Sequence, residues 1–360
     1  MNIYVVAYME QNYGDDLMLA RLVQEMEENC EIYIYCPPNR IQFYRYFFRN
    51  CENVHFAQYP LSRIYKYEKN FFDYVIFIGG SIFQGGIEHS VKSRIKCIIA
   101  IMIAKMLGAK FLVLGCNVGP FATKFKKILI QINLRQACFL TTRDSYSYDF
   151  ICKTRRKTKN VFLYPDILSS ISRHLGIQKQ SNDEVLGISV YGYSLTGESL
   201  LAPLTDFCDL YVEKTGGRVV LLCFCTGAEG DDIAAEELFQ RVKKKENFSI
   251  IRHAPNRKDI IEAMATCSRL LAIRFHAAIL SVSLGIPFLS ICYSNKMQEY
   301  LKDIGHSERA NTVKHFINVD KKFFLEELLN HPIIPSDSWT YGADSHFKIL
   351  RDFMKGECND

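Results

Sequence analysis

Short, almost wholly apolar runs alternate along the chain with longer stretches in which apolar residues recur at helical spacing. Apolar runs without polar alternation are typical of strands buried on both faces, as in parallel sheets. The first half therefore predicts a succession of β-α-β units. We expect strands at 2–8, 31–36, 53–56, 73–78, 110–115, 138–142 and 160–163, and helices at 15–29, 40–50, 90–107, 123–136 and 144–153.

The alternation pauses at residues 172–184, "SRHLGIQKQSNDE", a polar stretch that predicts a linker, and then resumes. We predict an α/β protein with two Rossmann-like domains, residues 1–172 and 185–338, that face a cleft. A last helical stretch within 339–360 is expected to pack back on the first domain. In the second domain we expect strands at 185–190, 218–224, 248–252, 269–273 and 287–291, and helices at 196–215, 231–245, 256–267, 276–284 and 296–304.

Length, charge and cysteine usage narrow the class of protein. A chain of 360 residues is longer than one ordinary core supports, which favours two domains. The net charge of +5 is small for this length and argues against a dedicated nucleic-acid binder. The thirteen cysteines are scattered without a C-x-x-C pair, and no secretory signal is visible, so we expect reduced thiols in a cytoplasmic protein.

Two further classes of site are not supported. The apolar stretch 95–115 is interrupted by Lys105, Gly108 and Lys110, so it predicts a buried helix and a strand rather than a membrane span. No cluster of His, Cys and carboxylates has metal-ligand spacing, and no G-x-G-x-x-G motif is present. We therefore expect neither a metal nor a nicotinamide cofactor.

Three loops rich in Gly and Asn follow predicted strands of the first domain: "NYGDD", "GGSIFQGG" and "NVGP". Glycines let backbone N–H groups approach a ligand, and helix starts favour anions. Each loop alone is equally well explained as a tight turn or a helix cap, but three loops at three strand ends favour a ligand site. The candidate contacts are Asn12, Gly14, Asp15, Gly79, Gly80, Ser81 and Asn117.

Two more strand ends carry charges. "LTTRDSYSYDFI" places Arg143 at a strand-to-helix junction, where it could be part of a surface ion pair or of a ligand site. "LYPDILSSI" places Asp166 after a strand and a proline, where a turn aspartate is the simpler interpretation. The basic run at 153–159 is best interpreted as a solvated loop, with contact to an anionic membrane surface as the alternative.

Residues 270–296, "LLAIRFHAAILSVSLGIPFLSICYSNK", bring cations into an apolar region. If Arg274 and His276 both continue the strand, they point the same way, because strand side chains alternate. Buried cations need anionic partners, which a bound phosphate or carboxylate would supply. Lys296 follows the next predicted strand. A core histidine and a solvated lysine are the alternatives, but the convergence of three cations favours an anion site.

In this order, the motifs resemble the polysaccharide pyruvyl transferase family. They are "NYGDD", "GGSIFQGG", "NVGP", "TTRDSYS", "YPD" and "RFHAAILSVSLGIPFLSICYSNK", and the resemblance as a whole covers roughly residues 3–305. The resemblance implies a fold like that of GT-B nucleotide-sugar glycosyltransferases. It also implies phosphoenolpyruvate as donor and, as acceptor, two hydroxyls of a sugar in a cell-surface polysaccharide or its lipid-linked precursor, which would become a cyclic ketal.

The same resemblance assigns roles to residues. The family's donor-site residues fall on Arg143, Arg274, His276 and Lys296. His276 would be the general acid, Arg274 and Lys296 would hold the phosphate, and Arg143 the carboxylate. Asp15 or Asp166 would deprotonate the acceptor, a choice the motifs leave open. An enzyme of this kind would work in the cytoplasm or at the inner face of the membrane. The alternatives are a GT-B glycosyltransferase with a nucleotide-sugar donor and a non-catalytic glycan-binding protein.

Overall fold

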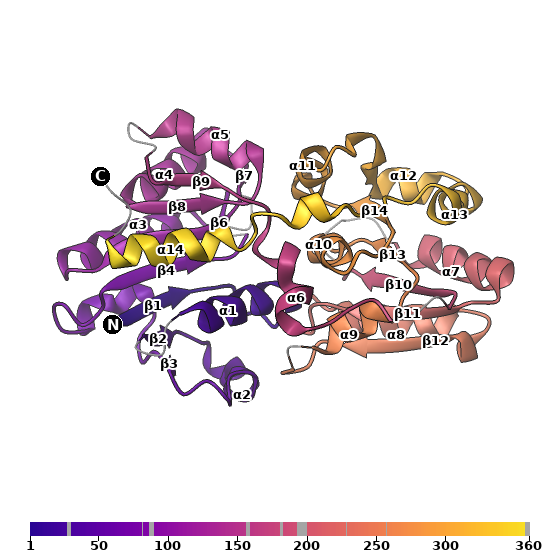
Figure 1. Cartoon of the computed structure of the whole chain (residues 1–360), viewed down its shortest axis with the longest axis horizontal. Coiled ribbons are helices and arrows are strands. Elements are labelled where there is room, and N and C mark those ends of the chain that lie inside the picture. The colour runs from indigo at the N-terminus through magenta and orange to yellow at the C-terminus, as the bar shows by residue number, and fades with distance from the viewer. Residues whose placement is uncertain are drawn as a thin grey trace. The chain divides into compact units, whose positions relative to one another are not determined.

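The chain forms two α/β units, each built around its own parallel sheet (Figure 1). Unit 1 comprises Met1–Met9, Asp15–Ile167 and Gly342–Asp360, and unit 2 comprises Glu10–Gly14 and Leu168–Tyr341. A computed structural model describes residues 1–26, 30–80, 82–85, 90–155, 159–180, 183–192, 200–227, 229–256 and 258–356.

Seven parallel strands form the sheet of unit 1, in the order β3-β2-β1-β4-β6-β8-β9. Its central strands are buried along almost their whole length, which explains their continuous apolar sequences. The strands are β1 (Asn2–Val6), β2 (Glu31–Ile34), β3 (Val54–Phe56), β4 (Tyr74–Ile78), β6 (Lys110–Cys116), β8 (Phe139–Thr142) and β9 (Val161–Leu163). The helices are α1 (Tyr13–Glu25), α2 (Ile41–Phe47), the 3-10 helix η2 (Leu61–Lys66), α3 (Val91–Met106), α4 (Lys124–Gln136), α5 (Ser145–Thr154) and α14 (Ser345–Lys355).

Helices cover both faces of this sheet. Leu140 of β8 lies in one apolar cluster with Ile101 of α3 and Ile130 of α4, so these helices share a face. Phe139 points to the opposite face, because side chains alternate along a strand. There its ring lies 5.1 Å from the ring of Phe353 in α14. The last helix of the chain therefore completes the core of unit 1.

Six parallel strands form the sheet of unit 2, in the order β12-β11-β10-β13-β14-β15. They are β10 (Val185–Val190), β11 (Arg218–Cys223), β12 (Phe248–Arg252), β13 (Arg269–Ala272), β14 (Phe288–Cys292) and β15 (Asn311–Thr312). The helices are α6 (Ile171–Leu175), α7 (Leu201–Thr215), α8 (Asp231–Arg241), α9 (Asp259–Ala265), α10 (Phe275–Leu284), α11 (Asn295–Asp303), α12 (Val313–Asn318) and α13 (Lys321–Asn330).

The predicted α/β class, with two Rossmann-like parallel sheets, is confirmed. Several local predictions differ from the structure, among them the following three. The predicted linker 172–184 begins inside helix α6, whose Ile171 is buried. Helices α12 and α13 were missed, although Phe316 and Phe324 anchor them in the core of unit 2. The small sheet of β5 (Phe83–Gly85) and β7 (Val118–Phe121) lies in segments that were predicted as ligand loops or tight turns, without strands. Among the described residues, no helix combines the length and apolarity needed to cross a bilayer.

His346 fixes α14 to the sheet of unit 1. Its side chain is fully buried, with Nε2 2.8 Å from the carbonyl oxygen of Pro165 and Nδ1 2.6 Å from Oγ1 of Thr141. Because a carbonyl only accepts, Nε2 carries the proton. Thr141 then donates to Nδ1 and accepts from the amide of Gly115. Burial lowers the pKa of His346 to about 4.

We expect acid to destabilise unit 1 through His346. The unfolded chain protonates this histidine near pH 6.5 and the folded chain near pH 4, so its contribution is complete above pH 6.5 and falls as pH drops through that window. The loss should reach about 3 kcal/mol. Urea unfolding at neutral and acidic pH measures it. His346→Gln should flatten the pH dependence, whereas the same change at the exposed His331 should not. Equal slopes for the two variants would contradict this role.

Candidate active site

Six of the predicted site residues come together in unit 1, at the carboxyl ends of neighbouring strands. Glycines 79 and 80 follow β4, Asn117 follows β6, Arg143 follows β8 and Asp166 follows β9. These four strands are adjacent in the sheet, so their carboxyl ends lie at one edge. That edge is where open α/β sheets bind ligands. We call these residues, together with Asp15, the Arg143 cluster.

Arg143 is the centre of this cluster. Its Nη1 donates to Oδ2 of Asp166 at 2.7 Å and its Nη2 donates to Oδ1 of Asn117 at 3.0 Å. The side chains of Arg143 and Asp166 are 2% and 1% exposed. Asp144, the next residue, caps α5 by accepting from the amide of Ser147 at 2.7 Å. Arg143 is therefore a buried residue at a strand end, and its ion pair with Asp166 is buried as well.

Two glycines leave room for this arrangement. A Cβ on Gly80 would lie 1.8 Å from Nη2 of Arg143, so a larger residue there would displace the guanidinium. Gly79 has a φ of 112°, which side chains rarely adopt, and its Cβ would lie 3.3 Å from Oδ1 of Asp15. The glycines predicted to let a ligand approach thus also let Arg143 and Asp15 approach the end of β4. Ser81, the next predicted contact, lies outside the described residues.

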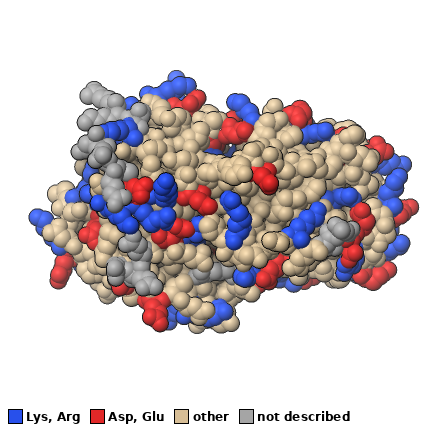
Figure 2. Space-filling view, viewed as in Figure 1, with Lys and Arg blue, Asp and Glu red and all other residues tan. Residues whose placement is uncertain are grey.

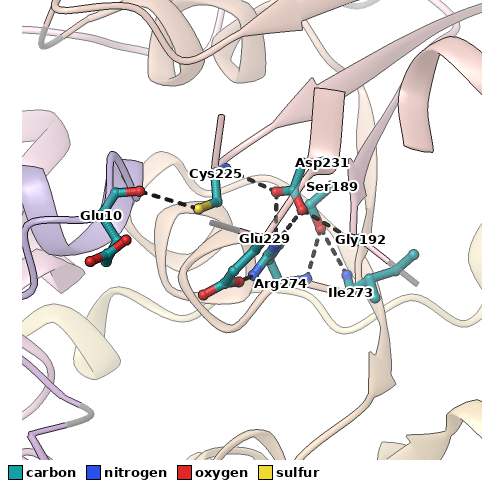
Figure 3. Close-up of polar contacts among 8 residues, drawn as sticks. All are labelled: Glu10, Ser189, Gly192, Cys225, Glu229, Asp231, Ile273 and Arg274. Carbon is teal, nitrogen blue, oxygen red and sulfur yellow. Dashed lines mark hydrogen bonds and ion pairs between the residues drawn. The ribbon is translucent and has the colours of Figure 1, made fainter. Parts of the chain in front are cut away.

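Arg274 is the centre of a second cluster, in unit 2 (Figure 3). Its Nε donates to Oδ2 of Asp231 at 3.0 Å, its Nη2 pairs with the other oxygen of Asp231, and its Nη1 pairs with Glu229. Its Cζ lies 4.3 Å from the ring centroid of Tyr191. Tyr191 follows β10 and Arg274 follows β13, the two strands between which the strand order reverses. This is the second place in the protein where the fold favours ligand binding.

Arg274 and Asp231 form a buried ion pair. Burial raises the pKa of Asp231, and the Arg274 guanidinium opposes that shift. Burial lowers the pKa of Arg274, but the carboxylates of Asp231 and Glu229 outweigh it and hold the pKa above the ordinary value. Asp231 also accepts from the backbone amides of Gly192 and Cys225, at 3.0 and 2.9 Å. The anionic partners expected from a bound ligand are therefore supplied to Arg274 by the chain itself.

The prediction that Arg274 and His276 share one face of a strand is wrong. Strand β13 ends at Ala272, and Oγ of Ser189 accepts from the amides of residues 273 and 274 at 2.8 and 3.0 Å, which turns the chain into α10. Arg274 is the N-cap of that helix and His276 lies in its first turn. Residues two apart on a helix point in different directions, because each residue turns by about 100°. The residues after Ala272 are apolar at both strand spacing and helix spacing, so the sequence pattern did not show where the strand ends.

His276 instead lies against the N-terminal loop. A Cβ on Gly14 would lie 1.9 Å from Nδ1 of His276, so any larger residue there would displace the imidazole. Asn12 forms a β-bridge with Cys225, and the amide of Tyr13 donates to the carbonyl of Phe224 at 2.8 Å. The structure thus brings together three predicted residues, Asn12, Gly14 and His276.

Lys296 lies in the first turn of α11 and is half-buried. Its helix contacts α10 through the rings of Phe275 and Tyr300, whose centroids are 5.8 Å apart. Sequence reasoning missed Tyr191, Glu229 and Asp231. A usable signal existed for the two carboxylates, because "EGDD" follows the buried strand β11 closely and carboxylates at a strand end are candidates for a site. No group of three or more metal-ligating side chains is found in the part of the chain that the structure describes.

The sequence of the chain is similar to a protein family and to a named relative. The family model described as polysaccharide pyruvyl transferase matches residues 12–295. The amylovoran biosynthesis protein AmsJ of Erwinia amylovora is 22% identical over 305 residues, covering 76% of this chain and 68% of that protein.

Solved structures show the same fold. UDP-GlcNAc 2-epimerase of Methanocaldococcus jannaschii has a TM-score of 0.62 at 11% identity, covering 98% of this chain and 99% of that one. Anabaena Alr3699/HepE in complex with UDP-glucose has a TM-score of 0.54 at 8% identity, covering 99% of both chains. The predicted GT-B-like architecture is thereby confirmed.

Proposed function

Because the chain belongs to the polysaccharide pyruvyl transferase family, we propose that it transfers pyruvate from phosphoenolpyruvate to two hydroxyls of a sugar and so forms a cyclic ketal. The observation that carries the proposal is the family match over residues 12–295, which contains both clusters. Lys296 follows the match directly. As the family resemblance implies, the acceptor would be a saccharide of a cell-surface polysaccharide or its lipid-linked precursor.

In the proposed mechanism, His276 protonates C3 of the enol, and C2 becomes electrophilic. One acceptor hydroxyl adds to C2 and gives up its proton to a base. The second hydroxyl then adds as the bond from C2 to the phosphate oxygen breaks, and its proton leaves with inorganic phosphate. The product carries the former C3 as a methyl group. A positioned acid such as His276 contributes ~10²–10⁴ to a rate.

We propose different roles for the two arginines. We propose that Arg143 binds the donor carboxylate and Lys296 its phosphate, as the family motifs imply. Arg274 already pairs with two carboxylates, and we propose that it positions the start of α10, and with it His276, rather than contacting the donor. Asp166 pairs with Arg143, and we propose that either Asp15 or Asp166 is the base that deprotonates the acceptor.

Incubation of the protein with phosphoenolpyruvate and a panel of saccharides tests the proposal. Mass spectrometry should show a product that has gained pyruvate with loss of water, and an equal amount of phosphate should be released. The control replaces phosphoenolpyruvate with UDP-glucose. Transfer of a hexose in that control, without pyruvate transfer in the main reaction, would favour a glycosyltransferase, the function suggested by the likeness to a UDP-glucose complex.

A further inference from the structure

Two neighbouring helices of unit 1 expose apolar side chains on their outer surface. Of sixteen exposed large hydrophobic residues in the described part of the chain, seven lie on α3 and α4, which shows that the exposure is concentrated there. On α3 they are Ile95, Ile99, Met102 and Met106, from 40% to 78% exposed. Successive spacings of four, three and four residues place them on one stripe of the helix.

Helix α4 repeats this arrangement. Phe125, Ile128 and Ile132 are 53%, 49% and 38% exposed and are spaced three and four residues apart. Both helices pack on the same face of the sheet, through Ile101 on α3 and Ile130 on α4, and they contact each other. In each helix the exposed stripe lies opposite the residues that pack on the sheet. The two stripes therefore form one outward-facing apolar surface, which we call the α3–α4 face.

The charges on these helices have a single sign. Together α3 and α4 contain eight Lys and Arg residues and no Asp or Glu, although the whole chain carries a net charge of only +5. On the face drawn in Figure 2, by contrast, blue and red side chains are interspersed. Arg94 and Lys126 are buried. The six exposed cations are Lys92, Lys96, Lys105, Lys124, Lys127 and Arg135.

We propose that the α3–α4 face docks on the surface of a bilayer that contains anionic phospholipids. Apolar side chains flanked by cations are what a helix needs to lie in the lipid headgroup region, where the apolar groups reach the acyl boundary and the cations meet lipid phosphates. The adjacent 3-10 helix η2, which packs on α3, adds the exposed Tyr65 together with Arg63 and Lys66. Aromatic rings of this kind are enriched at membrane interfaces.

A second copy of this chain fits the surface less well. A symmetric dimer through the α3–α4 face would place cations opposite cations, and neither helix offers a carboxylate to neutralise them. An acidic protein would satisfy the charges, but it would not explain apolar stripes that run along both helices. The inference does not rest on the proposed transfer reaction.

Co-sedimentation of the full chain with vesicles tests the proposal. Binding should require phosphatidylglycerol, should be weak on pure phosphatidylcholine, and should fall as salt rises, because screening shortens the reach of the exposed charges. Two double variants probe the two parts of the surface: Ile99→Ser with Met102→Ser, and Lys92→Glu with Lys96→Glu. Each should lower the partition coefficient at least about tenfold. Unchanged thermal unfolding midpoints would show that the variants are folded.

Matched changes on unit 2 serve as controls. Ile233→Ser with Ile334→Ser removes two side chains that are 64% and 61% exposed, and Lys314→Glu with Lys322→Glu changes the net charge equally. Both controls should bind vesicles like wild type. Failure of wild type to bind anionic vesicles, or equal binding by all variants, would overturn the proposal. So would a lipid-free dimer that the Ile99/Met102 change dissociates, because the face would then bind a second copy. None of these readouts depends on transfer activity.

Discussion

The His276→Asn variant should lose pyruvate transfer by a factor of at least ~10² while it still binds phosphoenolpyruvate. Asparagine cannot supply a proton to C3 of the donor, but it keeps a polar group of similar size beside Gly14. Turnover is measured as phosphate release, and donor binding by calorimetry. We expect the donor dissociation constant to change by less than about tenfold, or ~1.4 kcal/mol.

Gly14→Ala is the companion variant. The added Cβ would lie 1.9 Å from Nδ1 of His276, so the imidazole has to move while the acid itself is retained. Because misplacement of about 1 Å can cost ~10² in rate, this variant should also lose turnover. Near-normal turnover in His276→Asn would show that the histidine only packs α10 against the N-terminal loop, and the proposed mechanism would be wrong.

Asp231→Ala should destabilise unit 2 by about 3–5 kcal/mol, the cost of breaking a buried ion pair from one side. The change leaves Arg274 with Glu229 alone, and it removes the acceptor for the amides of Gly192 and Cys225. Urea unfolding followed by fluorescence measures the loss. The next residue, Asp232, provides a matched control because it is also in the first turn of α8 but is only half-buried.

Asp232→Ala removes a favourable interaction with the helix dipole and should cost no more than about 1 kcal/mol. If the two variants lose the same free energy of unfolding, the position of Arg274 does not depend on its ion pair with Asp231. The cluster would then be unable to position the start of α10, and the positioning role proposed for Arg274 would have no support.

The fold class could be predicted from the sequence because the patterns that indicate it lie within short segments of the chain. Buried parallel strands read as apolar runs, and the turns between them carry glycine and proline. The sequence also predicted much of the Arg143 cluster, for a related reason. Gly80, Asn117 and Arg143 each follow a strand, and successive strands of a doubly wound sheet end at the same edge. The strand order of the sheet therefore brings loops that are separate in the sequence into one site.

The partners of Arg274 could not be found in this way. Asp231 lies 43 residues away in the chain, and the pairing depends on the reversal of strand order around β10, which no local pattern records. The end of β13 was also ambiguous. After Ala272 the residues "IRFHAAIL" are apolar at both strand and helix spacing. The turn depends on the hydroxyl of Ser189, on another strand, which accepts both amides at the junction.

The placement of α14 in unit 1 has a consequence for how a ribosome produces this protein. Unit 1 comprises the first and the last parts of the chain, and the whole of Leu168–Tyr341 is translated in between. Protein synthesis proceeds at about 5–20 residues per second. Phe353 is therefore added on the order of ten seconds or more after Phe139, whose face of the sheet it covers, and unit 2 can fold in the meantime. The core of nascent unit 1 can therefore close only after α14 has emerged from the exit tunnel.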